Sequence, residues 1–212
     1  MIPLKTYVPV SVIIPYDKDR GFLRFAIESV VNQTVKCEII TWKGDCWLSK
    51  NINDALRTST GKWIKILAED DLLPNTAIED LYNGVQGFDW ICADAENFGN
   101  LEDGWEEYPL WVGHIPTIEE MLIVNQIHGG TTIYSRDMIF EVGGWDESLW
   151  TGEEYDLHLK LMTKGYKLGY INKTVYKYRL HDNNKSMNLN EKDKQKRREY
   201  IQTKIRNRYK NI

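Results

Sequence analysis

VPVSVIIPY, residues 8–16, is a short and almost continuous apolar run that ends at Pro15 and Tyr16. A run of this kind is typical of a strand buried on both faces, as in a parallel sheet covered by helices. The next segment, GFLRFAIESVVNQ at 21–33, repeats its apolar residues at helical spacing. We therefore expect an α/β fold that begins with a buried strand.

The same order of strand and helix recurs along the first 95 residues. Further strands are expected at 37–42, 62–68 and 88–95, and further helices at 49–60 and 72–85. Four alternations favour a mostly parallel, doubly wound sheet flanked by helices, with ligands at the carboxyl ends of the strands. From 98 to 130 the periodicity is lost and we expect a loop. Beyond it, strands are expected at 131–135, 167–172 and 174–181, with helices at 135–144 and from 153 onward.

The composition is that of an ordinary globular protein. The chain has 212 residues, of which 42% are apolar and 27% charged, so we expect one domain. It has no apolar run long enough to span a membrane, and its first residues do not resemble a secretion signal, which favours a cytoplasmic location. Cys37, Cys46 and Cys92 lack the spacing of a metal site, and we expect them to be reduced.

The charges are unevenly distributed. Residues 1–184 carry 17 basic and 28 acidic side chains, a net charge of −11, whereas residues 185–212 carry 10 and 3, a net charge of +7. A basic tail of this kind could contact nucleic acid or anionic lipid. We expect instead a solvated helix that balances the acidic body, because its apolar stripe is thin. No nucleic-acid partner is expected, and peripheral contact with a membrane stays open.

An acidic cluster follows the third expected strand, in AEDDLLP at 68–74. Glu69, Asp70 and Asp71 would lie at the carboxyl end of that strand, where open α/β sheets bind ligands. Adjacent carboxylates repel one another unless a cation compensates them, and such ligands suit Mg²⁺ or Mn²⁺. The alternative is that Asp71 or a neighbour caps the helix that is expected to start near Pro74.

A second acidic pair opens the helix predicted in WTGEEYDLHLKL, residues 150–161. Leu157 and Leu161 are four residues apart, as a buried helical stripe requires, so Glu153 and Glu154 lie at the helix N-terminus. Carboxylates at this position can simply stabilise the helix through their interaction with the positive end of its dipole. The sequence around the pair offers a more specific interpretation.

Five segments together resemble the family 2 glycosyltransferases with the GT-A fold, in the order in which those enzymes have them. They are VSVIIPY, FLRFAIESVVNQT, NINDALRTSTGKWIKILAEDDLLP, GGTTIYSRDMIFEVGGWDESLWTGEEYDLHLKLMTKGYKL and YKYRLHDNNKS. The resemblance covers roughly residues 8–187. It implies an enzyme that moves a sugar from a nucleotide diphosphate to an acceptor hydroxyl, usually with inversion. It also implies a nucleotide-sugar half at about 1–97, an acceptor half at 98–184 and a basic helical tail at 185–212.

The resemblance implies roles for both acidic motifs. The metal-binding Asp-x-Asp element of the family corresponds to Ala68-Glu69-Asp70, so Ala68 replaces the usual first Asp. Asp70 and Asp71 are then the expected ligands of Mn²⁺ or Mg²⁺, together with His181. The second acid of the later pair is the family's general base, which implies Glu154 for that role and Glu153 as its acidic partner.

Other site residues follow from the same resemblance. Nucleotide-sugar contacts are expected from Pro15, Tyr16, Asp17, Asp45, Lys50 and Asp70. Acceptor or sugar contacts are expected from His128, Gly129, Gly130 and Trp150, with Trp105 and Trp111 nearby and the 98–130 segment as a lid. The acceptor would be a glycan or a lipid-linked molecule.

Two other functions stay open at this point. A sugar nucleotidyltransferase also uses an α/β sheet and a metal, although the chain has no Gly-rich loop after the first strand. A catalytically inactive glycan-binding domain is the third alternative, and the replacement at Ala68 is the feature that suggests it.

Overall fold

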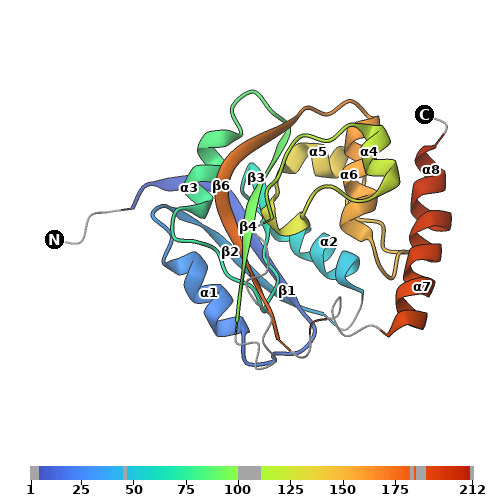
Figure 1. Ribbon diagram of the computed structural model, residues 1–212. Coiled ribbons are helices and arrows are strands. Elements are labelled where there is room, and N and C mark those ends of the chain that lie inside the picture. The colour runs from blue at the N-terminus through green and yellow to red at the C-terminus, as the bar shows by residue number, and fades with distance from the viewer. Residues whose placement is uncertain (1–4, 45–46, 100–110, 182–183, 185–189, 211–212) are drawn as a thin grey trace.

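A sheet of six strands runs through the centre of the structure, a computed structural model that describes residues 5–44, 47–99, 111–181, 184 and 190–210 (Figure 1). The strands are β1 (Tyr7–Tyr16), β2 (Lys36–Lys43), β3 (Trp63–Ile66), β4 (Trp90–Phe98), β5 (Ile133–Ser135) and β6 (Leu168–Arg179). Their order in the sheet is β2-β1-β3-β5-β4-β6. β1 is parallel to β2 and β3, and β4 is parallel to β6, whereas β5 is antiparallel to β3 and β4.

Helices cover both faces of this sheet. They are α1 (Leu23–Val31), α2 (Leu48–Thr58), α3 (Ala77–Gly84), α4 (Ile118–Ile123), α5 (Arg136–Glu141), α6 (Glu153–Thr163), α7 (Glu191–Tyr200) and α8 (Asn207–Tyr209). A 3-10 turn, η1 (Gly129–Thr131), precedes β5, and a π-helical segment, η2 (Ile201–Arg206), joins α7 to α8. The predicted fold class is therefore confirmed, with one antiparallel strand inside a mostly parallel sheet.

Alternation along β1 explains why both faces are buried. Val10, Val12 and Ile14 pack in one core cluster together with buried residues of α1 and α3. Ile13 points the other way, into a second cluster built with α2, α5 and α6. Because successive side chains of a strand leave opposite faces, an unbroken apolar run supplies both cores.

Two predicted segments differ from the structure. The 98–130 segment was expected to be a loop, yet its described part contains α4, whose capping box joins Thr117 and Glu120. The capping box stabilises this helix locally, and its apolar pattern is too short to predict it from the sequence. The two late strands are one strand, β6, because a register shift against β4 near Asp94 absorbs the residues between them. Residues 100–110, with Trp105, lie outside the described residues.

The C-terminal helix is partly built into the core. α7 has no buried residue, as a solvated helix should, but Ile205 in η2 and Tyr209 in α8 are buried against the cluster that contains α6. Figure 1 shows α7 and α8 lying along the outside of α6. Within the described ranges, no helix is long and apolar enough to cross a membrane.

Candidate active site

Asp71, in the turn after β3, faces the interior. It is 2% exposed, its Oδ2 accepts a hydrogen bond of 2.5 Å from the hydroxyl of Tyr176, and its Oδ1 accepts one of 2.7 Å from the backbone N–H of Arg179. Burial and the charge of Asp70 raise the pKa of this carboxyl to about 7. Through these two hydrogen bonds Asp71 joins the turn after β3 to β6. Each oxygen keeps a second lone pair, so the role of Asp71 as a metal ligand stays a prediction.

Asp70 and His181 do come together. The Nε2 atom of His181 lies 3.1 Å from Oδ2 of Asp70, and the Nε atom of Arg179 donates to the backbone carbonyl of Asp70 at 2.7 Å. His181 also lines a cavity of about 590 Å³ with Phe22, Phe98, Gly99, Arg179 and Leu180. Among the residues that the structure describes, no group of three or more His, Cys, Asp or Glu side chains is arranged to hold a metal ion. Two of the three predicted metal ligands, Asp70 and His181, thus lie side by side, and metal binding itself stays a prediction.

An arginine that the sequence analysis missed connects the ends of β1 and β3. Arg20 donates to Asp17, with an Nη1 to Oδ1 distance of 2.9 Å, and also to Glu69. The hydrogen bond from Arg20 lowers the pKa of Asp17 to about 2, whereas burial raises the pKa of Glu69. Asp17, predicted as a nucleotide contact, is thus held by an ion pair at the edge of the acidic cluster.

Glu154 lies at the start of α6, after Gly152, whose φ of 77° is left-handed. Its carboxylate packs directly on Gly129, so closely that a Cβ at Gly129 would overlap it. Burial and the charge of the neighbouring Glu153 raise the pKa of Glu154 to about 7, against the opposing charge of Lys65. A carboxyl with a pKa near the working pH is suited to general acid–base chemistry.

Lys65 on β3 is the second functional candidate that sequence reasoning missed. It is fully buried, its Nζ atom donates to the carbonyl of Gly130, and the same atom lies 5.0 Å from the centre of the Tyr176 ring. Burial lowers its pKa to about 7, and the charges of Glu154 and Asp71 oppose that shift. A lysine inside the apolar run KWIKILA was the available signal. The charges of Glu154, from the later acidic motif, and of Asp71, from the earlier one, therefore both act on Lys65.

Aromatic rings gather beside Glu154. The Nδ1 atom of His128 accepts from the backbone N–H of Gly130 at 3.1 Å, and burial lowers the pKa of His128 to about 4, so the ring is neutral at pH 7. Its centre lies 5.9 Å from the Trp111 ring and 5.5 Å from the Tyr176 ring. The predicted sugar-contacting residues at 128–130 are therefore placed next to the predicted base.

Other predicted site residues have separate surroundings. Pro15 is buried in β1, and the carbonyl of Tyr16 accepts from Gly44 N–H at 3.0 Å. Lys50 forms a 2.6 Å ion pair with Asp54 in the same helix. Trp150 is 40% exposed, and its ring lies 5.1 Å from that of Tyr200 in α7, beside the C-terminal helix. Asp45 lies outside the described residues.

The packing of Glu154 on Gly129 gives a first prediction. The sugar transfer that the sequence resemblance implies should fall about 10²-fold in Gly129→Ala, because the new Cβ moves the flexible carboxylate while leaving the fold intact. Gly130→Ala is the contrasting variant, since its Cβ would meet the buried ring of Tyr176 and should lower the thermal midpoint instead. Steady-state kinetics and thermal unfolding of both variants check this. A fully active Gly129→Ala would show that Glu154 is not needed where it lies.

No family model matches the chain, and no curated protein sequence matches it. Solved structures do match. S. aureus TarS aligns with a TM-score of 0.61 at 13% identity, over 81% of this chain and 36% of that one. TarS 1–349 in complex with UDP-GlcNAc aligns with a TM-score of 0.66 at 12% identity, over 85% and 61%. The complex of TarS 1–349 with UDP gives 0.61 at 12%, over 81% and 60%.

The chain therefore spans 36–61% of the length of the structures that it matches. At this level of identity the likeness shows the fold, and these neighbours have the GT-A fold. The fold expected from the five segments is thus found in the structure.

Proposed function

We propose that this chain transfers a sugar from a nucleotide diphosphate to an acceptor hydroxyl, with Glu154 as the general base. The observation that carries the proposal is the desolvated carboxylate of Glu154, which packs on Gly129 beside Lys65 in a GT-A fold. TarS 1–349 was solved with UDP-GlcNAc and with UDP, so UDP sugars are the first donors to test.

The proposed reaction is a single in-line displacement. The acceptor oxygen forms a bond to the anomeric carbon while the bond from that carbon to the diphosphate breaks, which inverts the configuration and releases the nucleoside diphosphate. Glu154 accepts the hydroxyl proton as the bond forms, a contribution of typically ~10²–10⁴-fold. Glu153, one residue earlier in α6, would bind an acceptor hydroxyl and raises the proton affinity of Glu154.

The chemistry of the donor set fits a divalent cation in part. Asp70 and His181 would hold Mn²⁺ or Mg²⁺, since a carboxylate oxygen and an imidazole nitrogen lie 3.1 Å apart there. Bound at this position, the ion would supply Lewis-acid stabilisation of the charge on the leaving diphosphate. Asp71 accepts one hydrogen bond at each oxygen, so it would join these two ligands only through a remaining lone pair. The acceptor we propose is a glycan or a lipid-linked molecule.

The test is a panel of nucleotide sugars, beginning with UDP-GlcNAc, with and without MnCl₂. A bound donor should raise the thermal midpoint, and release of UDP should follow. Glu154 must be deprotonated to act as a base, and its pKa is about 7, so the rate should rise with pH up to about 7 and level off above it. Below that point it should fall about tenfold per pH unit.

The panel also separates the alternatives. Release of pyrophosphate from a nucleoside triphosphate and a sugar phosphate would identify a nucleotidyltransferase. Binding of a glycan without turnover of any nucleotide sugar would identify an inactive binding domain. Either result, or a thermal midpoint unmoved by every donor, contradicts the proposed transfer.

A further inference from the structure

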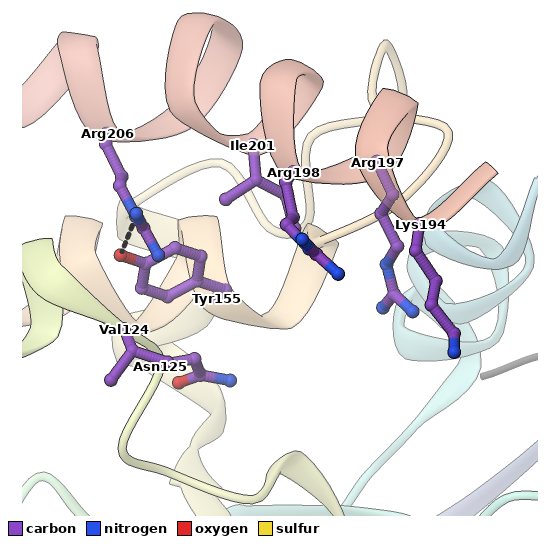
Figure 2. Close-up of a pocket in the computed structure, with 8 residues that line it drawn as sticks. All are labelled: Val124, Asn125, Tyr155, Lys194, Arg197, Arg198, Ile201 and Arg206. Carbon is purple, nitrogen blue, oxygen red and sulfur yellow. Dashed lines mark hydrogen bonds between the residues drawn. The ribbon is translucent and has the colours of Figure 1, made fainter. Parts of the chain in front are cut away.

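A second cavity, of about 360 Å³, lies between the C-terminal helix and the neighbouring α4–α6 region (Figure 2). It is lined by Val124, Asn125, Tyr155, Lys194, Arg197, Arg198, Ile201 and Arg206. Four of these eight residues are cationic and none is acidic. Such a concentration of positive charge is unexpected beside a body, residues 1–184, that carries a net charge of −11.

The cations are incompletely neutralised. Lys194 pairs with Glu191 at 2.8 Å, and Arg198 reaches the same carboxylate only at 3.9 Å. The Nε atom of Arg197 is buried and has no hydrogen-bond partner within the described part of the chain. Figure 2 shows Lys194, Arg197 and Arg198 extending from α7 in the same direction. A buried donor without a partner costs free energy, so the Nε atom of Arg197 is suited to bind an anionic ligand.

The rest of the lining contributes apolar surface and a fourth cation that is held in place. The Nε atom of Arg206 donates to the hydroxyl of Tyr155 at 3.2 Å, which fixes the fourth cation (Figure 2). The Tyr155 hydroxyl in turn donates to the carbonyl of Met121. Val124 and Ile201 supply apolar surface. Guanidinium groups can bind the anionic group of a ligand, while the apolar residues contact its organic part.

We propose that this cavity binds the phosphate group of a phosphate ester, with Arg197, Arg198 and Lys194 contacting the phosphate and Val124 and Ile201 contacting the organic part. Arginine forks fit phosphate oxygens, and the cavity volume admits one such group. A long nucleic acid is disfavoured because the acidic body would repel it. A soluble phosphate ester and a phospholipid headgroup share this chemistry.

The proposed site shares no residue with the proposed sugar-transfer chemistry. Glu154 packs on Gly129 beside the sheet, whereas the next residue, Tyr155, lines this cavity on the side of the C-terminal helix. Binding can therefore be measured directly on the full chain, and its failure would leave the proposed reaction untouched.

The experiment compares the unmodified chain with Arg197→Gln. Lys196→Gln is the matched control, because it removes one positive charge from an exposed neighbour in α7 that does not line the cavity. Glycerol 3-phosphate is titrated by calorimetry, and phosphatidylcholine vesicles with and without phosphatidic acid are tested by flotation. We expect saturable binding to at least one probe, weakened about tenfold or more by Arg197→Gln and less than about twofold by Lys196→Gln.

The outcomes are distinguishable. Binding of glycerol 3-phosphate supports a soluble ester as ligand, and binding of the acidic vesicles alone supports a phospholipid. Equal weakening by the two variants, or no saturable binding to either probe, overturns the proposal. Thermal unfolding is recorded for each variant, and Arg198→Gln replaces Arg197→Gln if the latter does not fold.

Discussion

Glu154→Gln is expected to lower kcat/KM for sugar transfer by about 10²–10⁴-fold, the range that a positioned general base contributes. The amide has the size of the carboxylate and can still pack on Gly129, but it cannot accept the hydroxyl proton. Initial rates of UDP release in the presence of acceptor measure the effect. The rise of the residual rate through pH 7 should also disappear, because the group that titrates there has been removed.

Two controls make this result specific. The donor-induced shift in thermal midpoint should be unchanged in Glu154→Gln, since the proposed base would contact the acceptor and not the nucleotide. Glu153→Gln should have a smaller effect and should move the pH profile to lower pH, because Glu153 raises the pKa of Glu154. A Glu154→Gln variant within threefold of the original activity would mean that another group takes the proton.

Replacing Arg208 with Met and Tyr209 with Phe together should lower the free energy of unfolding by about 3 kcal/mol. Asp156 in α6 is fully buried, and its Oδ1 atom accepts from the Tyr209 hydroxyl at 3.0 Å and from Arg208 at 3.1 Å. After the double substitution, Lys160 at 3.9 Å from Oδ2 is the one cation among the described residues that still pairs with this carboxylate. A buried charge without its partners is strongly destabilising. Urea unfolding at pH 7 measures the loss.

Lys210→Met is the matched control, because it removes an exposed charge one residue later and should change stability by less than about 0.5 kcal/mol. Adding Asp156→Asn to the double variant should recover part of the loss, since it removes the buried charge itself. A double variant as stable as the original chain would show that the C-terminal helix is held by apolar contacts alone.

The sequence alone determined those features that depend on local periodicity. The unbroken apolar run at 8–16 and the helical spacing that follows it require a strand buried on both faces next to a helix. Repetition of that pattern gave the mostly parallel sheet, and the sheet located the acidic cluster and the Glu153–Glu154 pair at element ends. The strand β5 was expected, but its antiparallel direction was not, and the helix α4 was missed because its segment is short and its pattern weak.

Only the tertiary structure decided which side chains meet. Asp71 turns inward because Tyr176 and Arg179, more than 100 residues later, supply its hydrogen bonds. Lys65 was expected only as part of a strand, and its position against Gly130 follows from the pairing of β3 with β5. The cationic cavity exists because Ile205 and Tyr209 anchor the C-terminal helix beside α6. Burial and charge at a site are set by neighbours distant in the chain, and these leave no periodic signal in the sequence.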